Sequence, residues 1–179
     1  MSDPDDSTKP PGATLAAELG DQLREQDATI ATAESCTGGL MGAALTAVPG
    51  SSDYFDRALV TYAYDAKRQL LGVNREDLDD HGAVSEPVAR QMASGVRDTA
   101  DVTWGVGITG VAGPGGGTEE TPVGTVYLGV AYAGPWETNE SYTTVSRYEF
   151  EGDRSAVRSA TVQQALEDVL AELRLVSGL

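Results

Sequence analysis

The chain has 179 residues, 40% of them hydrophobic, and a formal net charge of −16 from 28 acidic and 12 basic residues. This length suffices for one domain with its own core, a single cysteine excludes an internal disulfide, and the lack of a basic stripe disfavours nucleic-acid binding. No apolar stretch of transmembrane length and no signal-peptide pattern is found, so we expect a cytoplasmic protein with no membrane partner.

The first residues, 1–13, are rich in Pro, Asp and Ser and are predicted to form a disordered acidic tail ahead of a single domain over 14–179. Apolar residues at helical spacing predict a first helix over 15–24, and the short apolar run 28–33 predicts a buried strand. Thr37 is expected to cap the helix that follows, which Pro and Gly end near residue 50.

The middle of the chain continues the alternation of strands and helices. A strand is predicted over 55–61 and a helix over 63–71. Ser85, followed by a proline in the first turn, is expected to open a helix to about residue 99. A third strand is predicted over 102–108, and the glycine-rich run 109–118 is predicted to be a loop.

The last part of the chain predicts a change of topology. Two segments with alternating apolar residues, 123–132 and 141–150, are expected to form an antiparallel pair. Asp153 is expected to cap a final amphipathic helix to about residue 175. Strands that alternate with helices and then form a meander predict an α/β fold, a three-layer α/β/α sandwich with a mixed sheet of about five strands.

Candidate chemistry begins at Ser35, between a predicted strand and a predicted helix. The helix dipole and free N–H groups of Cys36, Thr37 and Gly38 would favour an anion formed when this serine attacks a carbonyl. Gly38 and Gly39 would let a substrate approach the backbone closely. Two alternatives stay open: Ser35 or Thr37 only caps the helix, or the glycine-rich turn cradles a phosphate.

Lys67 is the only lysine outside the predicted tail, the other being Lys9. It lies five residues after Tyr62, so both side chains could reach the cleft beside Ser35. A desolvated lysine can take the proton of a serine hydroxyl, and the tyrosine would relay a proton or orient either group. The alternative is an ordinary solvated lysine. Scarce lysine together with diffuse acidic charge also favours a protein adapted to high salt.

The histidine and the cysteine of this chain are weak candidates for metal binding or catalysis. His81 is the only histidine and is expected to close a turn, so a metal site built on two histidines is impossible, and we expect neither a metal nor a cofactor. Cys36 has no basic neighbour in sequence that would lower its pKa, which favours a small buried residue over a nucleophile.

Two further regions are candidates for substrate binding. Thr109, Gly110 and Gly113 belong to the glycine-rich run, which could form an anion nest or a lid. Arg154 and Arg158 lie at the start of the last predicted helix, where they could meet a phosphate of the substrate or only a surface carboxylate.

Four motifs of this chain resemble those of the CinA C-terminal domain family, to which the nicotinamide-nucleotide amidases belong. The resemblance runs from about residue 15 to 175 and implies an α/β/α fold. The motifs lie at 33–39 (AESCTGG), 62–67 (YAYDAK), 81–85 (HGAVS) and 109–126 (TGVAGPGG followed by PVGTV).

The resemblance implies that the substrate is a small nucleotide, nicotinamide mononucleotide, hydrolysed to nicotinate mononucleotide and ammonia. The nucleophilic serine of the family falls on Ser35, its tyrosine on Tyr62 and its lysine on Lys67. Tyr64 stands where the family usually has asparagine, and Thr121 where it often has lysine. Larger members carry an N-terminal domain that this chain is expected to lack.

An alternative reading is a catalytically inactive nucleotide-binding module of the same fold. The substitution at Tyr64 favours that alternative, whereas the joint presence of Ser35, Tyr62 and Lys67 favours the amidase. The sequence leaves the oligomeric state open, a homo-oligomer included.

Overall fold

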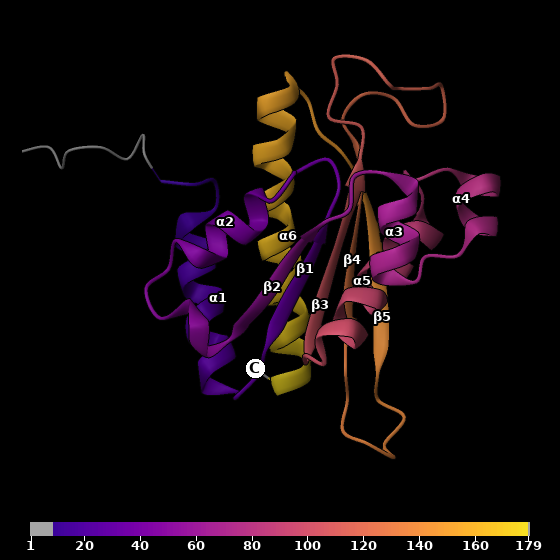
Figure 1. Ribbon diagram of the computed structural model, residues 1–179. Helices are drawn as coiled ribbons and strands as arrows, with labels where there is room; N and C mark the ends of the chain where they lie inside the picture. The colour runs from indigo at the N-terminus through magenta and orange to yellow at the C-terminus, as the bar shows by residue number, and fades with distance from the viewer. Residues whose placement is uncertain (1–8, 179) are drawn as a thin grey trace, which may run out of the picture.

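A five-stranded mixed sheet with helices on both faces forms the computed structural model, which describes residues 9–178 (Figure 1). The strand order is β2-β1-β3-β4-β5, with β1 parallel to β2 and β3, and β4 antiparallel to β3 and β5. The predicted three-layer α/β/α fold is therefore confirmed. The strands are β1 (Ile30–Glu34), β2 (Phe55–Val60), β3 (Trp104–Gly110), β4 (Thr125–Tyr132) and β5 (Tyr142–Glu149).

Most of the predicted helices are confirmed to within a few residues. Of the tail predicted over 1–13, residues 1–8 lie outside the described residues, and residues 10–12 lead directly into the first helix. The helices are α1 (Ala13–Glu25), α2 (Leu40–Thr46), α3 (Tyr64–Leu71), α4 (Arg75–His81), α5 (Glu86–Ala100) and α6 (Arg154–Ser177), and a 3-10 turn spans Ser51–Asp53.

Two apolar clusters cover the two faces of the sheet. Helices α1, α2 and α6 pack on one face and α3, α4 and α5 on the other (Figure 1). The alternation along β1 explains how one strand serves both layers: Ile30 belongs to the first cluster, whereas Ala31 and Ala33 belong to the second. Burial of these side chains is the main force that holds the layers together.

Helix α5 lies unusually close to the sheet. A Cβ atom built on Gly107 of β3 would lie 2.5 Å from the backbone nitrogen of Ala93 in α5, closer than real Cβ contacts. Glycine at this position therefore lets the helix backbone approach the strand.

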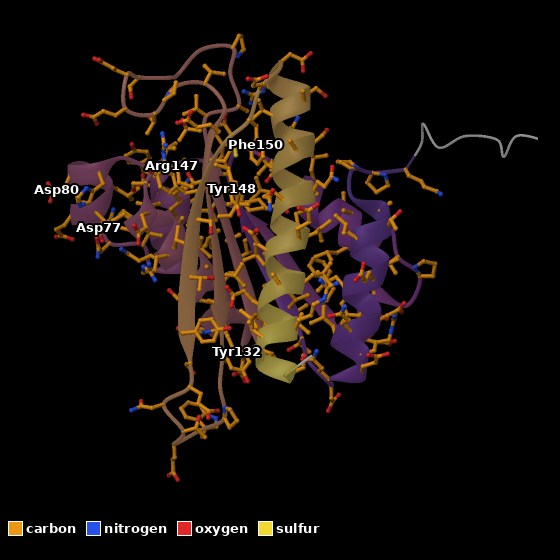
Figure 2. The ribbon with its side chains drawn as sticks, turned by 180° about the vertical axis from the view of Figure 1, so that it is seen from behind. Asp77, Asp80, Tyr132, Arg147, Tyr148 and Phe150 are labelled. Atoms are coloured by element: carbon orange, nitrogen blue, oxygen red, sulfur yellow. The ribbon has the colours of Figure 1, made fainter. Side chains whose placement is uncertain are left out.

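Polar contacts join the edge strand β5 to α6. The Tyr148 hydroxyl donates to Asp168 of α6 at 2.8 Å, and the rings of Tyr148 and Phe150 stack with centroids 5.7 Å apart (Figure 2). Tyr142 donates to Glu172 at 2.8 Å, one turn of α6 further on. These contacts lie on the far side of the molecule from β2.

The turn after β1 differs from the prediction. Helix α2 begins at Leu40 with Gly39 as its cap residue (φ 96°), so the expectation that Thr37 caps the helix is wrong. The Thr37 hydroxyl instead donates to the Glu34 carboxylate at 2.7 Å. In this turn the backbone folds around the buried Glu34 carboxylate, described below, and backbone N–H groups donate to it.

The boundary of β3 also differs. Thr109 and Gly110 were predicted to lie in the loop, but both belong to β3 and pair with Tyr127 and Val126 of β4. The glycine-rich loop therefore begins at Val111, and glycine at the strand end did not break the pairing because antiparallel neighbours continue alongside.

Helix α4 was not predicted. Its signal was present, since the Asn74 side chain caps the helix by accepting from the Asp77 N–H, and two acidic residues occupy the first turn. At the two other predicted caps, Asp153 accepts from the Ala156 N–H as expected, whereas the Ser85 hydroxyl donates to the Gly82 carbonyl instead.

No helix among residues 9–178 is long and apolar enough to cross a membrane. Within the same residues, no group of three or more His, Cys, Asp or Glu side chains lies in an arrangement that could hold a metal ion.

Candidate active site

The candidate site lies where the three parallel strands end together. Ser35 directly follows β1, and its N–H donates to the carbonyl of Ile108 in β3 at 2.9 Å. Thr61 directly follows β2, and its N–H donates to the Glu34 carbonyl at 2.8 Å. The carboxyl ends of parallel strands form the usual ligand-binding edge of an open α/β sheet. The topology therefore brings these residues to the edge where a substrate would bind.

Ser35 and Lys67 form a buried pair at this edge. The Lys67 Nζ lies 3.0 Å from the Ser35 Oγ, 2.6 Å from the Thr61 carbonyl oxygen and 3.1 Å from the Tyr62 carbonyl oxygen. The Lys67 side chain is 0% exposed, and burial lowers its pKa from 10.5 to about 8. A lysine with this pKa can act as a base near neutral pH.

The position of Lys67 in α3 explains its burial. The helix buries only two of its residues, Lys67 and Leu71, which are one turn apart on the face that packs against the rest of the domain. Lysine thus occupies a place where an apolar side chain would be expected. The alternative of a solvated surface lysine is wrong.

Tyr62 contacts Lys67 through its backbone carbonyl rather than through its phenol. Its carbonyl oxygen accepts from the Lys67 ammonium or amine, but its side chain is 64% exposed and lies at the mouth of the cavity described below. No hydrogen bond joins the phenol to Ser35 or Lys67 among the described residues. Tyr62 therefore lines the same cavity as Ser35, whereas Lys67, which was also predicted to reach the cleft, does not line it.

Cys36 is a buried residue, as predicted. Burial raises the pKa of its thiol from 9.0 to about 11. Because the thiolate and not the thiol is the nucleophile, a cysteine of this pKa is inert near neutral pH. Ser35 is therefore the stronger candidate nucleophile of this adjacent pair.

The sequence interpretation missed Glu34. This residue is fully buried at the end of β1, and its carboxylate lies at the start of α2. It accepts from five groups at distances of 2.7 to 3.4 Å. The donors are the hydroxyls of Thr32 and Thr37 and the backbone N–H groups of Gly39, Met41 and Gly42.

The Glu34 carboxylate takes the place of an external anion at this turn. It binds three of the N–H groups at the start of α2, and the Gly38 N–H donates to the Ser35 carbonyl at 3.1 Å. A phosphate cradle in this turn, one of the alternatives above, is therefore blocked. The N–H group of Cys36, which lines the cavity described below, is bonded to no carbonyl or carboxylate among residues 9–178, which leaves it as a candidate donor to a substrate.

Replacement of Glu34 should destabilise the fold strongly. Glu34→Ala would leave its buried donors unpaired, and each unpaired group costs about 1–3 kcal/mol. We expect the melting temperature, measured by circular dichroism, to fall by at least about 6 °C, because roughly 3 kcal/mol corresponds to that shift in a domain of this size. Glu149→Ala, which removes an exposed ion pair with Arg147, is the matched control and should change it by less than about 2 °C. An equal effect of both substitutions would contradict this role.

A cavity of about 230 Å³ lies beside the pair. Its walls are mostly apolar or glycine, with Ser35 on one side and a single charged side chain, Arg154, at another. The lining residues are Ser35, Cys36, Tyr62, Ala83, Val84, Thr109, Gly110, Val111, Ala112, Gly113, Gly115, Gly116 and Arg154.

The structure brings most of the predicted binding residues to this cavity, but three do not line it. Thr37 is fully buried and Gly39 donates to Glu34, so both act in the turn behind Ser35. Gly38 likewise lies in that turn, facing Arg158. Thr109 lines the cavity, but its hydroxyl donates to the Ala83 carbonyl at 2.7 Å.

Two arginines reach the site from α6, which packs on the face of the sheet opposite to α3. Arg154 donates to the Gly113 carbonyl at 2.6 Å, and Arg158 donates to the Thr37 carbonyl at 2.8 Å. A second cavity of about 640 Å³ is lined by both arginines and shares Arg154 and Ala112 with the first. The Nε atom of Arg158 is buried without a partner among the described residues. These cationic groups suit an anionic part of a ligand.

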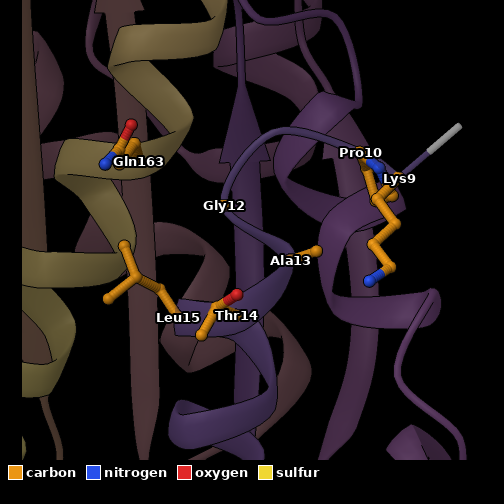
Figure 3. Close-up of a pocket in the computed structure, with 7 residues that line it drawn as sticks. All are labelled: Lys9, Pro10, Gly12, Ala13, Thr14, Leu15 and Gln163. Carbon is orange, nitrogen blue, oxygen red and sulfur yellow. The ribbon is translucent and has the colours of Figure 1, made fainter. Parts of the chain in front are cut away.

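The remaining candidates lie elsewhere. His81 ends α4 and faces Asp77 at 3.8 Å on the surface, outside the cavity. Another cavity, of about 300 Å³, lies at the start of α1 and contains none of the predicted site residues (Figure 3). Its residues are Lys9, Pro10, Gly12, Ala13, Thr14, Leu15 and Gln163.

Comparison with known proteins identifies the family. Residues 12–173 match the model of the CinA C-terminal domain. The chain is 46% identical over 160 residues to a CinA-like protein of Gloeothece citriformis and 50% identical over 155 residues to a CinA-like protein of Salinibacter ruber. These alignments cover 89% and 87% of this chain but 37% and 36% of the relatives, so the chain spans little more than a third of their length.

A solved structure supports the same family assignment. The competence/damage inducible protein CihA from Agrobacterium tumefaciens superposes with a TM-score of 0.83 at 40% identity, covering 89% of this chain and 93% of that one. The region matched by the family model includes every predicted site residue.

Proposed function

The chain belongs to the CinA C-terminal domain family, and we propose that it is an amidohydrolase that releases ammonia from the carboxamide of nicotinamide mononucleotide. The observation that carries the proposal is the buried contact of 3.0 Å between the Lys67 Nζ and the Ser35 Oγ, whose residue Ser35 lines a cavity. The choice of substrate rests on the resemblance of the four sequence motifs. No metal or cofactor takes part in the proposed reaction.

Lys67 is the base in the proposed reaction. In its neutral form the amine has two N–H groups, which match the two carbonyl oxygens of Thr61 and Tyr62, and one lone pair, which can face the Ser35 hydroxyl. After the proton moves to Lys67, all three N–H groups of the ammonium have oxygen partners. The three oxygen atoms around the Lys67 Nζ therefore provide hydrogen-bond partners for both the neutral amine and the ammonium.

The covalent steps follow from this proton transfer. The Ser35 Oγ attacks the carboxamide carbon while its proton passes to Lys67, and the ammonium then gives that proton to the departing nitrogen. Ammonia leaves, and an ester to Ser35 remains. Water attacks the ester while Lys67 takes one of its protons, and the ammonium then returns that proton to the departing Ser35 Oγ. The carboxylic acid product leaves and loses its remaining proton to solvent.

The oxygen of the attacked carbonyl becomes negatively charged and needs donors. The Cys36 N–H is a candidate, because Cys36 lines the cavity beside Ser35 and its N–H meets no carbonyl or carboxylate in the described part of the chain. Backbone donors of this kind contribute about 10²- to 10³-fold to rate in serine hydrolases.

The two adjoining cavities suit the two ends of a mononucleotide. The cavity beside Ser35 would hold the carboxamide and its planar ring, and Arg154 and Arg158 in the larger cavity would hold the phosphate. In a chain of net charge −16, a local pair of arginines also attracts an anionic substrate to this edge.

Ammonia release from nicotinamide mononucleotide by the purified protein, at high and at low salt, tests the proposal. We expect turnover that depends on enzyme concentration, with nicotinate mononucleotide as the second product. Binding of the nucleotide without release of ammonia at either salt concentration would favour the inactive binding module instead.

Tyr62→Phe distinguishes two roles of the tyrosine. Because no hydrogen bond joins the phenol to Ser35 or Lys67 in the described part of the chain, while the Tyr62 carbonyl is retained in the variant, we expect kcat to stay within about threefold of wild type. A loss of 100-fold or more, measured by the same ammonia assay, would instead show that the hydroxyl relays a proton. Tyr127→Phe, at a tyrosine of β4 outside the cavity, controls for general effects of removing a phenol.

A further inference from the structure

The segment between α4 and α5 forms one wall of the cavity beside Ser35. Ala83 and Val84 line that cavity directly. The wall begins at Gly82, whose φ of 73° and ψ of 170° are open to glycine and rare for other residues. The Ser85 hydroxyl closes the segment by donating to the Gly82 carbonyl at 2.9 Å. The backbone here is thus a tight, defined turn.

The Ala83 residue is held on both sides by side chains from distant parts of the sequence. Its N–H donates to the phenol oxygen of Tyr64 at 3.3 Å, and its carbonyl accepts from the Thr109 hydroxyl at 2.7 Å. Tyr64 is the first residue of α3, whereas Thr109 belongs to β3. Two hydrogen bonds from two different elements fix the wall against the body of the domain.

We propose that Tyr64 is a positioning residue that sets the separation between the Ala83 wall and Ser35, and so determines how tightly the site holds the amide-bearing ring. Tyr64 and Lys67 lie one turn apart on α3, so the helix that carries the base also carries the contact to the wall. The Tyr64 side chain is 48% exposed, so its ring is only partly packed against the protein. The hydrogen bond that its phenol oxygen accepts from the Ala83 N–H is therefore its defined contact. The inference rests on the proposed function for its substrate.

Tyr64→Phe should weaken binding while sparing the chemical step. Without the phenol, the wall would occupy its binding-competent position for a smaller fraction of time, and the apparent affinity falls by that fraction. For one neutral hydrogen bond we expect KM and Kd for nicotinamide mononucleotide to rise about 3- to 10-fold, with kcat within about twofold.

Hydrogen exchange gives a readout that does not depend on turnover. The Ala83 amide should exchange several-fold faster in Tyr64→Phe than in wild type, because its acceptor is gone. Tyr148→Phe is the matched control: it also removes a phenol hydrogen bond, to Asp168 on α6, but on the far side of the sheet (Figure 2). It should leave Ala83 exchange, KM and Kd unchanged.

Two results would overturn the proposal. One is unchanged exchange of the Ala83 amide in Tyr64→Phe, and the other is faster exchange with unchanged Kd and KM. If the wild-type protein bound the nucleotide without hydrolysing it, the amidase proposal would fail, while exchange and Kd would still decide the role of Tyr64.

Discussion

Replacement of Lys67 by methionine or by arginine should reduce kcat for ammonia release at least about 10³-fold, the range expected for loss of a general base. Methionine matches lysine in length and fills the same buried space but has no basic nitrogen. Arginine keeps the positive charge but cannot lose its proton in a protein. The two variants should therefore be almost equally inactive. Lys9→Met, which removes the other lysine of the chain, should retain wild-type turnover.

The same group should govern the pH dependence of the wild-type enzyme. Burial lowers the pKa of Lys67 to about 8, so the ammonium form, which cannot accept a proton, dominates below that pH. Below about pH 8, kcat/KM should rise tenfold per pH unit and then level off as the amine becomes neutral. This acid limb should be absent from the residual activity of Lys67→Met.

Two outcomes would remove Lys67 from the role of base. If Lys67→Arg kept most of the activity, the lysine would be an electrostatic contact, and Tyr62 would become the leading candidate. If the acid limb of the wild-type profile lay near the pKa of an ordinary carboxylate, about 4, another group would control the reaction.

The sequence predicted the fold because its layers are built from simple periodic patterns. The alternation in 123–132 and 141–150 predicted the antiparallel pair, and the apolar run 28–33 predicted the strand that became the sheet interior. The patterns did not predict the C-terminal boundary of β3. Gly110 is a residue type typical of loops, but in the structure it pairs with Val126 of β4.

The candidate pair was also accessible from sequence, but its environment was not. The scarcity of lysine pointed to Lys67, and the strand-to-helix turn pointed to Ser35. Glu34 escaped attention because a carboxylate beside a serine looks like an ordinary polar residue in a turn. Its five donors come together only after the chain has folded back, so no local pattern shows them.

Tyr64 shows the same limit. In sequence it is a departure next to Lys67 that suggested an altered pocket around the base. In the structure its hydroxyl reaches Ala83, nineteen residues away, and not the lysine. A long-range contact of this kind depends on how α3 and α4 pack together, which local spacing does not specify.

Ammonia release by Ser35→Ala, measured beside the wild-type protein, tests the central claim most directly. We expect the rate to fall at least about 10³-fold, because the group that forms the covalent ester is gone. The Kd for nicotinamide mononucleotide and the melting temperature should change little, since the Ser35 side chain makes one hydrogen bond within residues 9–178, to Lys67. Ser94→Ala, a serine of α5 bonded only within its helix, should behave as wild type. A Ser35→Ala protein that releases ammonia at a rate comparable to wild type would contradict the account.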